Sequence, residues 1–172
     1  MPKTLALGAV LLITLVSAAA FSQQALRVGS PVPQFSATSS DGIRYDLTAM
    51  RGKVVVLTFW STRCEICRVE LPRLSQSVAQ YDPAHVVYLA MSPESDEIVG
   101  PYLKNHTFRF KTVPNSFGTL LQYADRDRSG SLMMQYPAFY VIGRDGRLAY
   151  RGSGYGRTEQ LDTAVKHAMA VR

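Results

Sequence analysis

The chain has 172 residues, of which 47% are hydrophobic and 19% are charged, and its formal net charge is +6. This composition is typical of one folded domain with a sizeable core, and it excludes a disordered chain. The basic residues are scattered and form no run interleaved with aromatic residues, so we expect no nucleic-acid binding and a merely solvated basic surface.

The N-terminal segment has the order of a secretory signal. Lys3 precedes an apolar run over residues 5–16, and small residues fill positions 17–20. This order predicts a signal peptide over residues 1–20, with cleavage after Ala20. The alternative is an uncleaved membrane anchor, because residues 5–21 are nearly long enough to span a bilayer. Both interpretations predict a periplasmic or otherwise extracytoplasmic protein.

The next segment leads into the domain. Residues 21–40 are rich in Pro, Ser and Gln and predict an extended lead-in, which leaves residues 41–172 for the domain itself. A turn at positions 41–42 introduces a short strand over 43–47. Residues 54–60 are β-branched and aromatic, as is typical of a strand buried on both faces.

Strands and helices then alternate. Apolar residues recur at helical spacing over positions 66–81, and Pro72 is expected to kink this helix. The later expected elements are a strand over 85–91, a helix over 94–106, a short strand over 108–113, a short helix over 117–124, a hairpin of 138–142 with 147–151, and a helix over 158–171 capped by Thr158. This order predicts an α/β fold whose sheet is covered on both faces.

Two cysteines, Cys64 and Cys67, stand at the start of the first helix, directly after the buried strand. Only a deprotonated sulfur attacks a disulfide, and the unpaired N–H groups and dipole of a helix N-terminus lower the pKa of a thiol placed there. Cys64 is expected at that end. Cys67 follows one turn later, close enough to attack a mixed disulfide on Cys64 and release the partner. The pair predicts thiol-disulfide exchange.

Two structural interpretations compete with exchange. A zinc site usually needs four ligands, and besides the cysteines the chain offers only His85, His106 and His167, so we expect no resident metal. A structural disulfide that closes so short a loop would remove little entropy from the unfolded chain. We therefore expect both sulfurs to serve chemistry, with no cofactor beyond a redox-active disulfide.

Four segments share their order and spacing with a known family. They are residues 28–35, 51–57, 59–72 and 136–147. With these segments the chain resembles the thioredoxin superfamily, specifically the exported TlpA/ResA-like group with an AhpC/TSA or redoxin-type domain. The resemblance implies a thioredoxin-like α/β fold, with a central mixed β-sheet, helices on both faces, and a C-terminal β-hairpin and helix.

The resemblance also implies roles for the cysteines and for a second loop. Cys64 is implied to be the exposed nucleophile and Cys67 the resolving cysteine. The peptide between Tyr136 and Pro137 is implied to be cis and to lie beside the cysteines, where its backbone groups meet an extended substrate. Proline is the residue for which a cis bond is inexpensive. The alternative is a trans proline at the start of a strand.

Three more residues near the cysteines are candidates. The group carries a glutamate at the position of Glu70, where it tunes the cysteine pKa values or relays a proton; a solvated glutamate at the helix start is the alternative. Trp60 and Arg63 are implied at the substrate-binding surface, although core packing alone would explain Trp60. The chain departs from the group in having Arg63 for tryptophan and Ile66 for proline, and Thr58 replaces the buried aspartate of thioredoxins. These departures leave the redox potential open.

The implied function is that of an exported thiol-disulfide oxidoreductase, acting as a reductase in cytochrome c maturation or on copper-site cysteines. The implied partners are protein thiols and disulfides, such as apocytochrome c or copper-site proteins, and a membrane thiol electron donor. Thiol peroxidases share the fold, although Leu57 occupies the position of their proline. A copper-binding maturation protein would use both sulfurs as soft ligands, although relatives of that kind have wider cysteine spacing.

Overall fold

The computed structural model describes residues 26–171, built around a five-stranded sheet. Its strand order is β5-β4-β3-β8-β9; β3, β4 and β5 are parallel, and β8 is antiparallel to both neighbours. The strands are β3 (Val54–Phe59), β4 (Val86–Met91), β5 (Lys111–Val113), β8 (Ala138–Ile142) and β9 (Leu148–Ser153). The predicted signal or anchor over residues 1–20 lies outside the described residues, among which no helix is long and apolar enough to cross a bilayer.

The central strand β3 is buried along its whole length. Val55, Leu57 and Phe59 belong to the core on one face of the sheet. Val54 and Val56 belong to the core on the other face, as the period of two along a strand requires. The predicted strand buried on both faces is confirmed.

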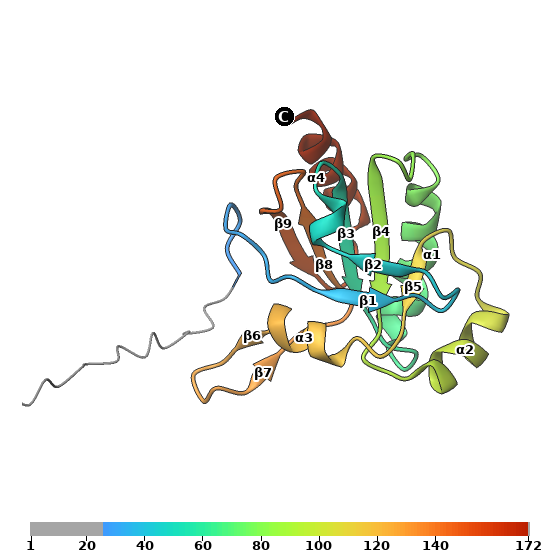
Figure 1. Ribbon diagram of the computed structural model, residues 1–172. Coiled ribbons are helices and arrows are strands. Elements are labelled where there is room, and N and C mark those ends of the chain that lie inside the picture. The colour runs from blue at the N-terminus through green and yellow to red at the C-terminus, as the bar shows by residue number, and fades with distance from the viewer. Residues whose placement is uncertain (1–25, 172) are drawn as a thin grey trace, which may run out of the picture.

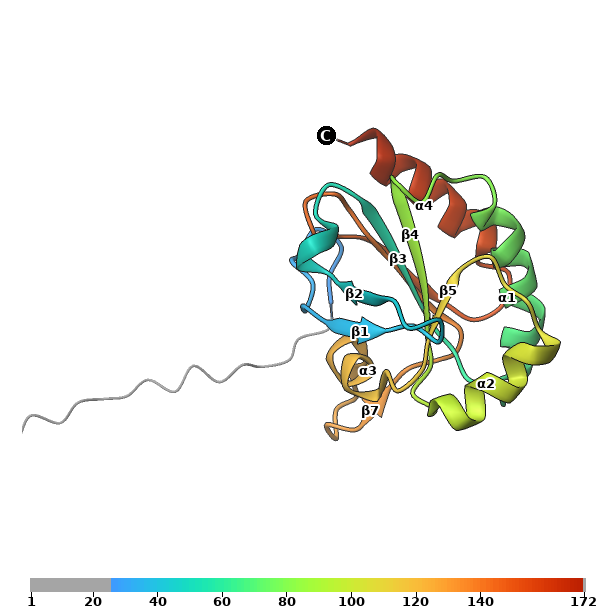
Figure 2. The same cartoon turned by 45° about the vertical axis from the view of Figure 1, so that its right-hand side comes forward.

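Helices cover both faces of the sheet (Figure 1, Figure 2). On one face α1 (Glu65–Val78) packs beside α4 (Thr158–Ala170), and α2 (Asp96–Asn105) adds Val99 to the same core. The other face is covered by α3 (Phe117–Tyr123), the 3-10 helix η1 (Thr48–Met50) and the segment before it. The predicted mixed sheet with helices on both faces is confirmed.

The segment before η1 contributes to the core. Val32 and Phe35 are buried against the face that α3 covers. β1 (Ser36–Thr38) and β2 (Arg44–Asp46) form an antiparallel pair beside them. Part of the predicted lead-in is therefore packed, because its apolar residues close one face of the sheet.

Two details differ from expectation. β6 (Asp125–Arg126) and β7 (Leu132–Met133) form a small antiparallel pair that no sequence pattern indicated, because each strand is too short to show alternation. The predicted cap at Thr158 is wrong, since Arg157 is the N-cap residue of α4 and no side chain caps that end. The Thr158 hydroxyl instead donates to Glu70 Oε2 at 3.0 Å. The Thr158 hydroxyl was expected to cap its own helix, but it bonds to a buried carboxylate on the neighbouring helix α1 instead.

A carboxylate joins α1 to α4. Asp162 on α4 accepts hydrogen bonds from Ser77 Oγ at 3.1 Å and from the Tyr81 hydroxyl, and it pairs with Lys166 Nζ at 2.7 Å. Burial raises the pKa of this carboxyl, but the bonds from Lys166, Tyr81 and Ser77 outweigh burial. The pKa of Asp162 therefore lies below its ordinary value of 3.8.

Replacing Asp162 with asparagine should lower the free energy of unfolding by about 1–2 kcal/mol near pH 7, because hydrogen bonds to a charged acceptor are lost. A depressed folded pKa gives stability that is complete above the unfolded pKa and disappears as the pH falls through the folded one. Urea unfolding should therefore give equal differences between the two proteins near pH 7 and about pH 5, and a shrinking difference below about pH 3. A difference that persists in acid would show that packing, not charge, is responsible.

Candidate active site

Three loops meet at one edge of the sheet because of the strand register. β3 and β4 are parallel, so their C-terminal ends lie together, with Phe59 opposite Met91. β8 is antiparallel to β3, so its first residue, Ala138, also lies opposite Phe59. The segments after β3 and β4 and the segment before β8 therefore share one edge, where the cysteines lie.

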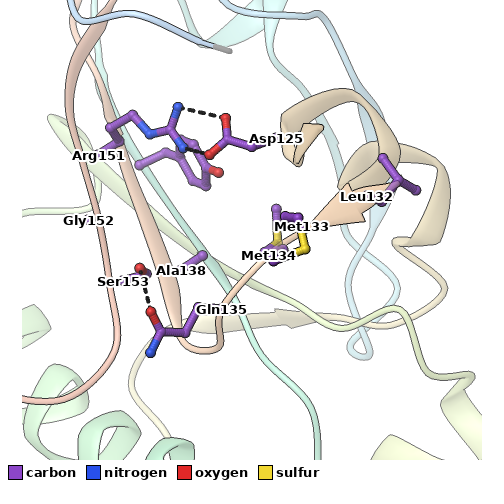
Figure 3. Close-up of a pocket in the computed structure, with 10 residues that line it drawn as sticks. Asp125, Leu132, Met133, Met134, Gln135, Ala138, Arg151, Gly152 and Ser153 are labelled. Atoms are coloured by element: carbon purple, nitrogen blue, oxygen red, sulfur yellow. Dashed lines mark hydrogen bonds and ion pairs between the residues drawn. The ribbon is translucent and has the colours of Figure 1, made fainter. Parts of the chain in front are cut away.

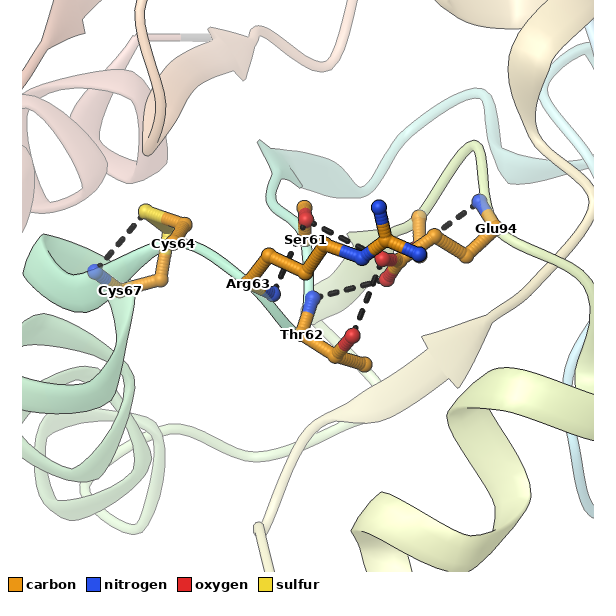
Figure 4. Close-up of a disulfide and its surroundings, with 7 residues drawn as sticks. Ser61, Thr62, Arg63, Cys64, Cys67 and Glu94 are labelled. Carbon is orange, nitrogen blue, oxygen red and sulfur yellow. Dashed lines mark hydrogen bonds between the residues drawn. A yellow bond between two sulfur atoms is a disulfide. The ribbon is translucent and has the colours of Figure 1, made fainter.

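The turn after β3 places Cys64 at the N-terminus of α1 (Figure 4). The Cys64 N–H donates to Ser61 O at 3.1 Å. Cys64 is the N-cap residue, and its sulfur accepts a hydrogen bond from the Cys67 N–H at 3.0 Å, a bond that serine or aspartate usually accepts at this position. The sulfur thus lies where free N–H groups and the helix dipole favour an anion.

Cys64 and Cys67 form a disulfide, with Cα atoms 5.2 Å apart. Cys67 is only 1% exposed, whereas Cys64 is partly exposed. An incoming thiol or disulfide can therefore reach Cys64 but not Cys67 in this conformation. The difference supports Cys64 as nucleophile and Cys67 as resolving cysteine, although the assignment itself stays a prediction.

Charged side chains flank Cys64. Arg63, Glu65 and Arg68 are exposed, and none of them forms an ion pair within residues 26–171. The Arg63 side chain extends away from the disulfide (Figure 4). Arg63 lies on the surface that a partner must approach, and its contact with a substrate stays a prediction.

Glu70 lies one turn beyond Cys67, and its side chain is 0% exposed. It pairs with Arg73 Nη1 at 3.1 Å and accepts the hydrogen bond from Thr158 Oγ1. The alternative of a solvated glutamate at the helix start is therefore wrong. A carboxylate buried between two helices needs such partners because an unpaired buried charge is costly. Its effect on the cysteines stays a prediction.

The peptide between Tyr136 and Pro137 is cis, as the resemblance implies, so the trans alternative is wrong. Pro137 is buried, and its carbonyl accepts a hydrogen bond from the Gly154 N–H at 2.9 Å. Tyr136 is half-buried. Burial raises the pKa of its hydroxyl, and the negative charge of Glu94 raises that pKa further. The tyrosine is thus neutral at physiological pH, and its contact with a substrate stays a prediction.

Trp60, the single tryptophan of the chain, is completely buried. Its ring packs against Tyr102 and Phe108, with ring centroids 5.4 and 6.5 Å away. The indole N–H has no hydrogen-bond partner among the described residues. The ring belongs to the same buried cluster as Cys67, and the predicted substrate contact of Trp60 would have to be indirect.

Glu94 belongs to this site although no motif points to it. It follows β4, and its carboxylate accepts the Thr62 N–H at 2.7 Å, in the turn before Cys64 (Figure 4). Only the parallel pairing of β3 with β4 brings together residues so far apart in sequence. The sequence offered one weak indication of this role. Glu94 closely follows a predicted buried strand, and the end of that strand was expected at the same edge of the sheet as the cysteines.

A pocket of about 420 Å³ adjoins the segment before Pro137 (Figure 3). Met133, Met134 and Gln135 line one side of it. Arg151 of β9, which forms an ion pair with Asp125, lines the other. Neither cysteine lines this pocket, so it is separate from the disulfide.

The described residues offer no metal centre. Within residues 26–171, no group of three or more His, Cys, Asp or Glu side chains is placed to hold an ion. His106, the C-cap residue of α2, stacks on Tyr102 with ring centroids 3.9 Å apart. Both cysteine sulfurs are bonded to each other in a disulfide.

Known proteins have sequences similar to this chain. A profile of the AhpC/TSA family matches residues 28–151. The thiol-disulfide oxidoreductase ResA of Bacillus thuringiensis subsp. konkukian is 24% identical over 145 residues, which cover 84% of this chain and 80% of ResA. The sequence similarity therefore extends well beyond the cysteine motif.

Solved structures show the same fold. A thiol:disulfide interchange protein of the thioredoxin family from Chlorobium tepidum superposes with a TM-score of 0.70 and 21% identity, over 84% of this chain and 98% of that one. A secreted disulfide oxidoreductase of Mycobacterium tuberculosis superposes with a TM-score of 0.60 and 22% identity, over 78% and 96%. Family profile, relatives and fold agree: the chain belongs to the AhpC/TSA family and is a TlpA/ResA-like thiol-disulfide oxidoreductase of the thioredoxin superfamily.

Proposed function

We propose that this oxidoreductase works outside the cytoplasm and reduces disulfides in partner proteins. The observation that carries the proposal is the partly exposed Cys64 at the N-terminus of α1, joined to the buried Cys67. An accessible attacking sulfur with a resolving sulfur one turn away suits exchange with a protein. The proposed substrates are the cysteines of apocytochrome c or of copper-site proteins, and the proposed electron donor is a membrane thiol protein.

The reaction is two successive exchanges. In the reduced protein, the Cys64 thiolate attacks one sulfur of the partner disulfide, whose other sulfur leaves as a thiolate and takes a proton from water. Cys67, once deprotonated, attacks Cys64 Sγ in the mixed disulfide and releases the second partner thiolate. Two electrons pass to the partner, and the protein is left with the Cys64–Cys67 disulfide that the structure contains.

The reduction potential tests the direction. We would measure it for residues 21–172 equilibrated with glutathione and dithiothreitol buffers. A value near that of thioredoxin, roughly −270 mV, is expected for a reductase. A value near roughly −120 mV would mark a disulfide donor and overturn the reductase proposal.

The extracytoplasmic location is supported by the signal pattern over residues 1–20 and by the secreted relative from Mycobacterium tuberculosis. Alkaline phosphatase is active only after export, so a fusion joined after residue 40 should be active in a bacterial host. The intact mass of the exported protein then separates cleavage after Ala20 from an uncleaved anchor. An inactive fusion would contradict the location.

Glu70 is the proposed proton acceptor for Cys67, because it is a buried carboxylate one turn away from a buried thiol. Replacing Glu70 with glutamine should slow the second exchange by about tenfold or more and leave the first unchanged. An aromatic disulfide such as Ellman's reagent releases one coloured thiolate in each exchange, so stopped-flow absorbance resolves both steps.

The matched control is Glu159→Gln, which removes an exposed charge beside Thr158. It should leave both phases at the wild-type rate. Equal second phases in Glu70→Gln and wild type would show that the carboxylate is structural only.

A further inference from the structure

The carboxylate of Glu94 accepts four hydrogen bonds from two loops. The Thr62 N–H and hydroxyl donate to it at 2.7 and 2.9 Å, and the Ser61 hydroxyl at 3.2 Å. The fourth donor is the Ser92 hydroxyl, at 3.2 Å. Charged acceptors form stronger hydrogen bonds than neutral ones. Glu94 therefore fixes both residues that follow Trp60, on the side away from the disulfide (Figure 4).

These bonds extend to Cys64 through the turn itself. The Ser61 hydroxyl that donates to Glu94 also accepts the Arg63 N–H at 3.1 Å. The Ser61 carbonyl accepts the Cys64 N–H at 3.1 Å. Every residue from Ser61 to Cys64 is thus hydrogen-bonded either to Glu94 or to a residue that Glu94 holds.

Glu94 has a rigid support of its own. Its N–H donates to Ser92 Oγ at 3.2 Å, and its carbonyl accepts the Asn115 N–H at 2.8 Å. Ser92 is buried, and its N–H donates to Val113 O at 2.8 Å. The carboxylate is therefore anchored to the sheet through β4 and β5, not to a free loop.

We propose that Glu94 is a positioning residue of the redox pair: its carboxylate orients the turn that carries Cys64, and its negative charge opposes negative charge on the Cys64 sulfur. The proposal rests on the thiol-disulfide activity and not on its direction. Because a stabilised thiolate makes a dithiol more oxidising, the charge of Glu94 makes this pair more reducing.

Other charged and titratable residues also lie near the cysteines. Arg63, Glu65 and Arg68 are exposed charged residues beside the cysteines in the sequence. The buried carboxylate of Glu70 is paired with Arg73. Tyr136, in the segment before β8, is neutral: burial raises the pKa of its hydroxyl, and the negative charge of Glu94 raises that pKa further. The charge of Glu94 thus acts on a residue of another loop at the edge of the sheet where the cysteines lie.

Three substitutions at position 94 separate the effect of geometry from the effect of charge. Glutamine keeps the length and an acceptor oxygen but removes the charge, and the serine and threonine hydroxyls can turn to accept from its amide. Aspartate keeps the charge, but its shorter side chain no longer reaches Ser61 and Thr62. Alanine loses both. The exposed Glu97, in the first turn of α2, provides the control Glu97→Gln, which removes a carboxylate charge three residues further along the chain.

The reduction potential and the Cys64 thiol pKa test the proposed effect of the Glu94 charge. In Glu94→Gln and Glu94→Ala, we expect the equilibrium constant with glutathione to move three- to tenfold toward the reduced protein, about 15–30 mV at 29.6 mV per tenfold. The thiol pKa, followed by thiolate absorbance, should fall in the same two variants. Glu94→Asp and Glu97→Gln should stay near wild type in both measurements.

The rate at which Cys64 attacks Ellman's reagent, corrected for the thiolate fraction, tests whether Glu94 orients the turn that carries Cys64. It should fall about three- to tenfold in Glu94→Asp and Glu94→Ala, because the sulfur is less well oriented. It should stay within about twofold in Glu94→Gln. Wild-type potential and thiol pKa in Glu94→Gln would overturn the charge role, and a wild-type corrected rate in Glu94→Ala would overturn the orienting role.

These outcomes are independent of the proposed function. The reductase direction depends on the absolute potential of the wild type, whereas the role of Glu94 depends on differences between variants. Circular dichroism and thermal unfolding of each variant show whether the fold is kept. If Glu94→Ala does not fold, the glutamine and aspartate variants still test the two roles separately.

Discussion

Replacing Cys64 with serine should reduce disulfide exchange to below about 1% of the wild-type rate, because no thiolate then attacks the partner disulfide. The structure supports this expectation, since Cys64 is the sulfur that solvent reaches. Reduction of insulin, followed by its precipitation in the presence of dithiothreitol, measures the loss against the uncatalysed background. A variant with substantial residual activity would mean that Cys67 becomes accessible by a movement of α1.

Replacing Cys67 with serine should have a different effect, because Cys64 still attacks but nothing resolves the mixed disulfide. The protein should accumulate as an adduct with its substrate that non-reducing gels show and dithiothreitol removes. The double variant provides the control, since it should form no adduct. A Cys67→Ser protein that turns over at the wild-type rate would contradict the resolving role and favour a mechanism with one cysteine.

Replacing Trp60 with alanine should lower the free energy of unfolding by about 3–5 kcal/mol, the usual cost of removing a large buried ring. Trp60 is 0% exposed and packs against two further aromatic rings. Because its indole N–H has no partner among the described residues, Trp60→Phe breaks no hydrogen bond there. That variant should cost less than half as much.

Urea unfolding followed by far-ultraviolet circular dichroism compares these variants, since the tryptophan fluorescence is lost. The control Val69→Ala removes a side chain from α1 that is 45% exposed, and it should change the free energy of unfolding by less than about 0.5 kcal/mol. A loss below about 1.5 kcal/mol in Trp60→Ala would show that the surrounding rings collapse into the cavity.

The site joins two kinds of interaction that depend on different distances along the chain. Cys64 and Cys67 are neighbours on one helix, so their spacing and their place after an apolar run are enough to predict their chemistry. Glu70 is also local to that helix, but its burial depends on Thr158 of α4. The helix pattern around Glu70 therefore left open whether its carboxylate is solvated or buried.

The helices and strands also divide into those that local sequence predicts and those that depend on contacts distant in sequence. The predicted strand at β3 and the helix at α1 agree with the structure because each has a strong local pattern of apolar residues. β6 and β7 have two residues each and show no such pattern. Val32 and Phe35 lie among turn-forming residues, and only the uncovered face of the sheet explains why they are buried.

The sequence by itself determined the cysteine pair, the buried strand before it, the helix that begins there and, by resemblance, the family. Those features depend on neighbouring residues and on spacing. The tertiary structure alone decided that Glu94 holds the turn before Cys64 and that Thr158 binds Glu70 instead of capping its own helix. Both contacts arise from the packing of segments distant in sequence, and a hydrogen bond across such a distance leaves no periodic signal in the chain.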